Sequence, residues 1–219
     1  MATPINSNWE ELKKQPFGPY IPDVVFKYRS DEIERILEWK EAHPLSSPIE
    51  VEIGSNYGKF LLGLARSRRE MNFLGIELKS SLVNRFVRRI EREGDTNCKC
   101  INADARLAIP VLFEPNSIDA IYVLFPDPWW KKRHASRRLL DDAFFNMAHT
   151  FLKPSGMVVV KTDVRPYYET VLEALKADAR YAFIPNDQIP NSDKWDLTNR
   201  EQHCIENEVP YDTLAVKKI

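Results

Sequence analysis

Residues 118–138 read IDAIYVLFPDPWWKKRHASRR and hold the pattern from which the fold can be worked out. The first eight residues are mostly apolar and rich in β-branched and aromatic side chains, which predicts a short buried strand. Pro126-Asp127-Pro128 ends this strand, because proline lacks the amide proton that a sheet needs and restricts the residue before it. Asp127 therefore follows the carboxyl end of a strand, the edge at which open α/β sheets bind ligands.

Aromatic and basic side chains follow this turn directly. They are Trp129, Trp130, Lys131, Lys132, Arg133, His134, Arg137 and Arg138. A carboxylate, two flat rings and a basic cluster predict a site that holds a nucleobase beside a phosphate backbone, with phosphate binding that weakens as salt rises. Taken alone, the stretch is equally compatible with a solvated turn beside core tryptophans.

Outward from this stretch, strand patterns and helix patterns alternate along the chain. We expect strands at 49–53, 72–77, 98–101, 118–125, 156–162, 181–184 and 213–217, and helices at 59–69, 80–93, 138–151 and 166–177. Such alternation predicts an α/β fold, with a parallel sheet covered by helices on both faces.

The first 45 residues differ from the rest, since they are polar and carry several prolines. They contain one expected helix, 30–41, with Ser30 as its N-cap and with Ile33, Ile36 and Leu37 on one face. We interpret residues 1–45 as an N-terminal extension packed on a single domain formed by residues 46–219.

Composition limits the class of protein. A chain of 219 residues with 43% hydrophobic and 29% charged residues is ordinary for one globular domain. No apolar run approaches the roughly 20 residues of a membrane helix, and the N-terminus lacks a signal-peptide pattern. Cys98, Cys100 and Cys204 are odd in number and lack metal-binding spacing, which favours a reduced, cytoplasmic protein without a metal site. Cys98 and Cys100 are expected to be packing residues on one face of a strand.

Each of the first four expected strands carries an acid at its carboxyl end: Glu52, Glu77, Asp104 and Asp127. Any one of them could be a solvated turn residue, but four at one sheet edge favour a binding site. Glu52 is placed to accept from an ammonium group, Glu77 to hold two ribose hydroxyls, and Asp104 to accept from an adenine amine.

Glycines at 54 and 58 follow the first strand and would let backbone amides approach a ligand closely. A dinucleotide fingerprint would need glycine at 56 and 59, where Asn56 and Lys59 stand. The sequence therefore disfavours a nicotinamide enzyme.

Several motifs together resemble the bacterial tRNA (guanine-7-)-methyltransferase family. They are the acid-glycine turn, GIE at 75–77, NADA at 102–105, FPDPWWKKRH at 125–134, KTD at 161–163 and TNRE at 198–201. The resemblance runs from about residue 49 to the C-terminus. It implies the Rossmann-like fold of class I methyltransferases, a seven-stranded, mostly parallel sheet with an antiparallel last strand. It also implies transfer of a methyl group from S-adenosylmethionine to a guanosine at position 46, in the variable loop of tRNA.

The resemblance also implies roles for individual residues. The cofactor pocket would be lined by Glu52, Gly54, Glu77, Asn102, Ala103, Asp104 and Asp127. The tRNA guanosine would be contacted by Lys131, Asp163, Thr198, Asn199, Arg200 and Glu201. Asp127 would lie nearest the chemistry and is the expected catalytic residue. The expected partners are tRNA and S-adenosylmethionine, with monomer and homodimer both open.

The chain departs from the family at two places. Asn56 stands where a glycine is usual, and since asparagine tolerates left-handed backbone we expect only a small loss of clearance for the cofactor. The QHCIENEVPYD segment after TNRE lacks a glycine that is often found there.

Guanine presents its 7-nitrogen as an acceptor lone pair, so its methylation requires no strong base, in agreement with the absence of an obvious nucleophile–base pair. Two alternatives remain open. One is a methyltransferase for a small molecule or protein; the other is a non-catalytic RNA-binding protein with the same fold.

Overall fold

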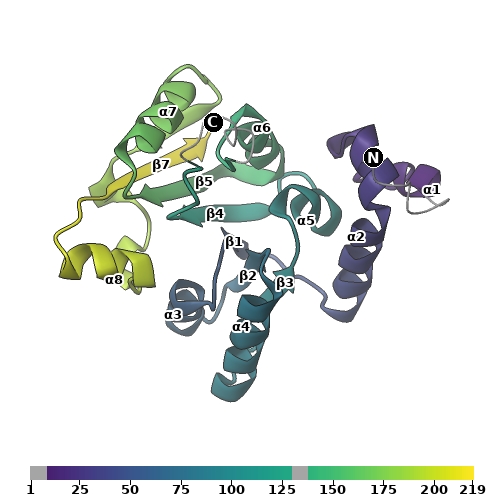
Figure 1. Cartoon of the computed structure of the whole chain (residues 1–219), viewed down its shortest axis with the longest axis horizontal. Coiled ribbons are helices and arrows are strands. Elements are labelled where there is room, and N and C mark those ends of the chain that lie inside the picture. The colour runs from purple at the N-terminus through teal and green to yellow at the C-terminus, as the bar shows by residue number, and fades with distance from the viewer. Residues whose placement is uncertain (1–8, 130–137) are drawn as a thin grey trace.

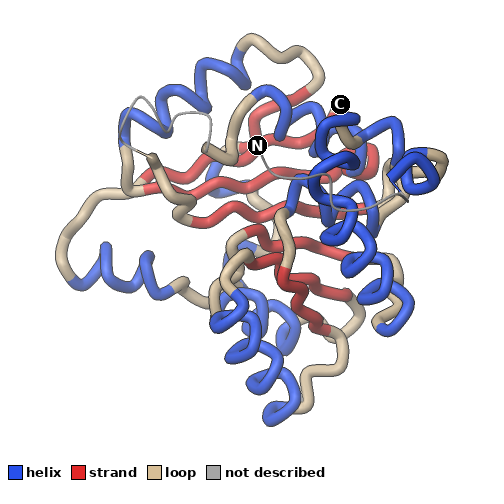
Figure 2. The backbone as a smooth tube through the Cα atoms, turned by 45° about the vertical axis from the view of Figure 1, so that its right-hand side comes forward, coloured by secondary structure: helices blue, strands red, loops and turns tan. Residues whose placement is uncertain are grey.

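Residues 9–129 and 138–219, which the computed structural model describes, form a seven-stranded sheet with helices on both sides (Figures 1 and 2). The strand order is β3-β2-β1-β4-β5-β7-β6. The strands are β1 (Ile49–Ile53), β2 (Asn72–Glu77), β3 (Cys98–Asn102), β4 (Ile118–Leu124), β5 (Leu152–Thr162), β6 (Tyr181–Ile184) and β7 (Asp212–Lys218). β7 is antiparallel to both of its neighbours, and the pairings among β1 to β5 are parallel. The expected α/β fold with an antiparallel last strand is confirmed.

Most of the described helices contribute to one of two hydrophobic cores, one on each face of the sheet. The helices are α1 (Trp9–Lys13), α2 (Asp23–Ala42), α3 (Lys59–Ser67), α4 (Ser80–Glu93), α5 (Ala105–Leu112), α6 (Asp142–Phe151), α7 (Arg165–Lys176) and α8 (Asn199–Glu206). α2, α5, α6 and α7 share one core. α3 and α4 cover the other face, where Cys98 and Cys100 are packed as expected. No helix of the described chain is both long and apolar enough to cross a membrane.

Strand β1 shows how the sequence assigns side chains to the two faces. Ile49, Val51 and Ile53 join the core of α2 and α5. Successive side chains of a strand point to opposite faces, so Glu50 and Glu52 both point toward α3. Two acids are therefore buried on the same face of β1, an inner strand of the sheet, each with 4% of its surface exposed.

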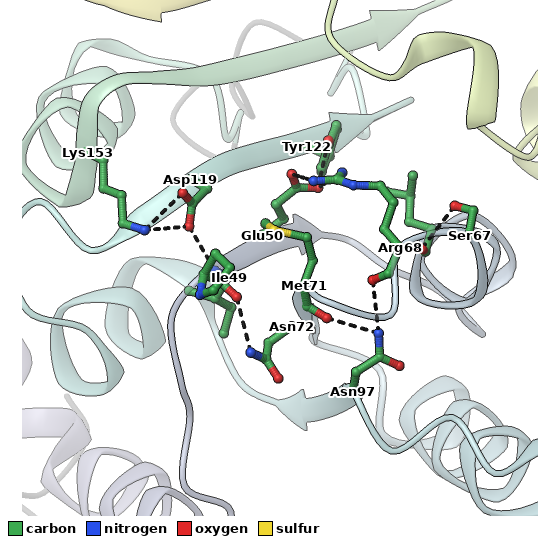
Figure 3. Close-up of polar contacts among 12 residues, drawn as sticks. Ile49, Glu50, Ser67, Arg68, Met71, Asn72, Asn97, Asp119, Tyr122 and Lys153 are labelled. Carbon is green, nitrogen blue, oxygen red and sulfur yellow. Dashed lines mark hydrogen bonds and ion pairs between the residues drawn. The ribbon is translucent and has the colours of Figure 1, made fainter.

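A buried ion pair neutralises the first of these acids (Figure 3). The guanidinium of Arg68, which ends α3, donates two hydrogen bonds of 2.8 and 2.7 Å to the two oxygens of Glu50. The hydroxyl of Tyr122, on β4, donates a third at 2.9 Å. The network ties α3, β1 and β4 together below the edge where the strands end.

Further polar contacts fix the amino-terminal edge of the sheet, opposite the strand ends (Figure 3). The side-chain amide of Asn97 donates to the carbonyls of Ala65 and Met71, each at 2.9 Å. Asp119 accepts from the Ile49 amide at 2.8 Å and forms an ion pair with Lys153. These contacts tie together the loops at this edge, which lies opposite the carboxyl ends of the strands where open α/β sheets bind ligands.

Two helix predictions need correction, and the helices α1, α5 and α8 were not expected. α2 begins at Asp23, well before Ser30, which lies one residue after a non-helical kink at Arg29 and has a buried hydroxyl without a hydrogen bond. α6 begins at Asp142, because Asp141 accepts from the Phe144 amide and so caps the helix there. α5 was not expected, since seven of its eight residues are buried and one of these is a proline, which leaves no clear amphipathic period.

Three strands are longer than expected: β3 by one residue, β7 by one residue at each end, and β5 by four residues at its start. β5 begins at Leu152 and not at 156, although Pro154 and Ser155 read as a turn. The division of the chain at residue 45 remains an interpretation. In the structure Phe26, Ile33 and Ile36 of α2 are 2% exposed or less and lie in the same core as the sheet.

The Glu50–Arg68 pair makes a prediction about stability. Arg68→Ala leaves an uncompensated buried carboxylate, so the free energy of unfolding should fall by about 3–5 kcal/mol, measured by urea denaturation. Lys176→Ala, which removes an exposed pair with Glu173, is the control and should cost less than about 1 kcal/mol. An equal loss in the two variants would contradict this account of the network.

Candidate functional site

Two adjoining hollows open at the carboxyl edge of the sheet, beside the point between β1 and β4 where the strand order reverses. The smaller has a volume of about 470 Å³ and the larger about 760 Å³. Both are lined by Gly54, Asn56, Phe125, Pro126 and Asp127. The two hollows thus meet where the loops after β1 and β4 face each other.

Glu52 lies in the wall of the smaller hollow and, unlike Glu50, forms no ion pair with another of the described residues. Its Oε2 atom is buried and accepts no hydrogen bond. Burial, with a smaller contribution from the charge of Glu77, raises the pKa of the Glu52 carboxyl to about 8. A buried acceptor of this kind fits a ligand that brings a cationic donor, such as an ammonium group.

The turn after β1 takes the left-handed backbone that the glycines predict. Gly54 has a φ of +76° and Gly58 a φ of +75°, and a Cβ on Gly58 would lie 2.0 Å from the ring of Phe86. Asn56 has a φ of 52°, so asparagine adopts the conformation that a glycine would provide. The turn keeps its shape despite this substitution.

Glu77 holds this turn against the end of β2. One of its oxygens accepts from the amide of Asn56 at 3.0 Å and the other from the amide of Lys79 at 2.9 Å. Its carboxylate lines the larger hollow. Each oxygen keeps a further lone pair, which suits a pair of neighbouring hydroxyls.

Asn102, Ala103 and Asp104 close the far end of the larger hollow. Ala103 and Asp104 line it, with Ile76 and Leu78 as apolar neighbours. Asn102 is not among its lining residues. Its amide donates to the carbonyls of Glu77 and Leu78, each at 2.9 Å, and so fixes the turn that follows β2.

Asp127 lines both hollows, is exposed, and accepts a hydrogen bond from none of the described residues. Around it, Phe125 and Trp129 have positive φ values of 54° and 44°. Bulky residues adopt this conformation at a cost of about 1–3 kcal/mol, and such strain concentrates at functional loops. The loop around Asp127 therefore has a backbone conformation that costs free energy, as is common in functional loops.

The N-terminus of α8 forms the wall of the smaller hollow that faces Asp127. Asp163, Thr198, Asn199 and Arg200 line this hollow. The guanidinium of Arg200 forms an ion pair with Asp163, with an Nε–Oδ2 distance of 2.9 Å. Polar groups that could orient a planar ring are thus brought together from two loops that are 37 residues apart.

Glu201 lies behind this wall and is not among the lining residues. It is 2% exposed, and its Oε1 atom forms an ion pair with Lys161 and accepts from the hydroxyl of Tyr211 at 3.0 Å. It also completes a capping box with Thr198, which starts α8. Its contacts support a role in holding Thr198 to Arg200 in place.

The remaining predicted residue, Lys131, lies outside the described residues, as do Trp130, Lys132, Arg133, His134 and Arg137. Two residues that the sequence analysis did not single out also line the smaller hollow. Tyr57 accepts from the side-chain amide of Asn199, and Lys59 donates to Gln202 at 2.7 Å. Tyr57 belongs to the expected glycine turn and Lys59 begins α3, but their partners are 142 and 143 residues away.

The polar side chains that line the two hollows fit a cationic ligand that carries an adenosine. Along the two hollows lie a buried carboxyl without a partner, a carboxylate for a diol, and an acid beside apolar residues for an amino-purine. The described residues include no group of three or more His, Cys, Asp or Glu side chains suited to a metal ion.

Comparison with known proteins agrees with this geometry. Residues 46–213 match a family model whose description is "Putative methyltransferase". The tRNA (guanine-N(7)-)-methyltransferase of Myxococcus xanthus is 34% identical over 64% of this chain and 68% of its own length. That of Levilactobacillus brevis is 33% identical over 68% of this chain and 72% of its own length. A methyltransferase of Streptococcus mutans, solved with S-adenosylhomocysteine, is 12% identical with a TM-score of 0.53, and the match covers 86% of this chain and 98% of that one.

The raised pKa of Glu52 makes stability depend on pH. Between its ordinary value of 4.5 and about 8, the folded protein keeps a proton that the unfolded chain has released. Stability should therefore fall as pH rises through this range, by up to about 1.4 kcal/mol per pH unit. Urea denaturation of the wild type and of Glu52→Gln at pH 5, 6.5 and 8 measures the effect, since glutamine has no carboxyl group that ionises in this range. Parallel pH profiles would show that Glu52 ionises normally.

Proposed function

Because the chain belongs to the family of tRNA (guanine-N(7)-)-methyltransferases, we propose that it methylates the 7-nitrogen of guanosine 46 in the variable loop of tRNA, with S-adenosylmethionine as donor. The observation that carries the proposal is the meeting of two hollows at Asp127. The larger hollow fits the adenosine part of the donor. The smaller hollow holds Glu52 and is also lined by polar residues from the loop after β5 and from α8.

S-adenosylmethionine, when bound, supplies a methyl group on a positively charged sulfur, which leaves as a neutral thioether as the carbon–nitrogen bond forms. Glu52 would hold the ammonium end, Glu77 the ribose hydroxyls and Asp104 the adenine amine. These positions would place the reactive carbon where the two hollows join. The Gly54 turn leaves room for the ligand there, since nothing lies within 4 Å of a Cβ built on Gly54.

On the acceptor side, Asp163 and Thr198 to Arg200 would orient the guanine ring. The reaction leaves a positive charge on the purine and requires no proton to be removed beforehand. Asp127 and Asp163 would stabilise that charge as it develops, and the protein would contribute mainly by holding both reactants in reactive geometry.

Basic side chains near the smaller hollow support a nucleic acid as the substrate. The guanidinium of Arg85, on α4, lies 4.9 Å from the ring centroid of Tyr57, which lines this hollow. Arg85 and Arg88 are exposed, and neither forms an ion pair with another described residue. They are available to phosphates of an RNA whose base enters the hollow.

The proposal extends to location. A tRNA-modifying enzyme meets its substrate in the cytoplasm, and Cys98, Cys100 and Cys204 are free thiols, which fits a reducing compartment.

The direct test is incubation with an unmodified tRNA transcript and methyl-labelled S-adenosylmethionine, followed by mapping of the labelled nucleoside. We expect 7-methylguanosine at position 46. A matched transcript with 7-deazaguanosine at that position lacks the accepting nitrogen and should take up no label. Label confined to a protein or small molecule would favour the first alternative, and tRNA binding without transfer would favour a non-catalytic protein.

Asp127 provides a test at the level of a single residue. Asp127→Ala should lower the rate of methyl transfer by at least about 100- to 1000-fold, because it removes a carboxylate placed at the developing charge. The midpoint of urea unfolding should stay unchanged, since Asp127 bonds to no described residue. Asp187→Ala, which removes another exposed acid, is the control. Near-normal turnover in Asp127→Ala would remove Asp127 from the catalytic role.

A further inference from the structure

We propose that Arg29, in the N-terminal helix α2, is a positioning residue that sets the affinity for the cofactor by orienting Asp104 toward the adenine amine. The inference rests on the proposed function, because it needs an adenine at the far end of the larger hollow. It gives the N-terminal segment a part in ligand binding that its sequence does not reveal.

Arg29 reaches Asp104 across 75 residues of sequence. Its Nη1 atom donates to Asp104 Oδ2 at 3.0 Å, and its Nε and Nη2 atoms donate to Glu32 Oε2 at 2.9 and 2.7 Å. Glu32 in turn accepts from the backbone amide of Asp104, with a distance of 3.4 Å. One turn of α2 therefore contacts both the carboxylate and the backbone of Asp104.

The other oxygen of the Asp104 carboxylate is also fixed. Oδ1 accepts from the amide of Arg106 at 3.0 Å, as the N-cap of α5. With one donor on each oxygen, the carboxylate is held in one orientation, and each oxygen keeps a lone pair. Asp104 lines the larger hollow beside Leu78 and Ala103, so a ligand in that hollow can reach these lone pairs.

The backbone of α2 is distorted at this residue. Arg29 has φ −134° and ψ 24°, which interrupts the helix between two regular segments. The kink lies where the guanidinium must reach the end of β3. A regular helix at Arg29 would have a lower conformational free energy. Arg29 therefore contacts Asp104 and Glu32 from a backbone conformation that local propensity does not favour.

The contact is poorly suited to a purely structural role. The side chains of Arg29 and Asp104 are 38% and 27% exposed, and ion pairs with this degree of exposure contribute little to stability. α2 is already anchored by Phe26, Ile33 and Ile36, which are buried in the main core. Loss of Arg29 should therefore change ligand affinity more than folding.

The test is calorimetric titration of the full-length protein with S-adenosylhomocysteine and with S-inosylhomocysteine, in which an oxygen replaces the 6-amino group. Arg29→Ala should weaken binding of S-adenosylhomocysteine about tenfold and leave binding of the inosine compound within about twofold of wild type. Arg29→Lys, which keeps the charge, should recover part of the loss. Arg35→Ala, which removes an exposed arginine of the same helix, should match wild type for both compounds.

Turnover separates this role from a catalytic one. At saturating S-adenosylmethionine, Arg29→Ala should keep the wild-type kcat while the KM for the cofactor rises, and its urea midpoint should match that of Arg35→Ala. Equal weakening of both homocysteine compounds, or unchanged binding of S-adenosylhomocysteine, would overturn the inference. If Arg29→Ala does not fold, Arg29→Lys carries the same comparison. Failure of the wild type to bind S-adenosylhomocysteine would instead overturn the proposed function.

Discussion

Burying a charged carboxylate costs free energy unless another group compensates its charge, and β1 carries two buried carboxyl groups on one face. Glu50 is compensated within the protein by Arg68 and Tyr122, and it joins three elements into a rigid base. Glu52, two residues further along, has no such partner among the described residues. Its carboxyl therefore keeps its proton until the pH approaches its raised pKa of about 8. The first acid is thus part of the internal structure, and the second is the group that the proposed function assigns to the ligand.

A second constraint connects the two substrate-facing loops through Lys161, near the end of β5. Its carbonyl accepts from the amide of Phe125 at 2.7 Å, which anchors the loop that carries Asp127. Its ammonium group forms the buried ion pair with Glu201 that fixes the start of α8. A single residue thus holds the walls on both sides of the smaller hollow, so the geometry of Asp127 relative to Arg200 depends on β5.

Sequence patterns predicted the elements whose periodicity is strong and whose ends are marked. β1, β2, β6 and α4 have the expected bounds. α5 was missed because uniform burial removes the helical period, whereas α8 could have been recognised from the Thr198–Glu201 capping box. Four acids at strand ends were foreseen because parallel strands end at one edge. The pairings of Arg29 with Asp104 and of Arg200 with Asp163 could not be foreseen, because they depend on how distant segments meet in space.

The protonation of Glu52 also explains how the site can accept a cation without a permanent buried charge. With a pKa of about 8, the carboxyl is mostly neutral near pH 7 while no cation lies beside it. An ammonium group within hydrogen-bonding distance favours the ionised form, so a bound cation would lower that pKa and release the proton. The protein then buries a compensated pair only when the ligand is present. Asp127 differs from Glu52 in being exposed, and in the proposed reaction it would face the charge that develops on the acceptor base.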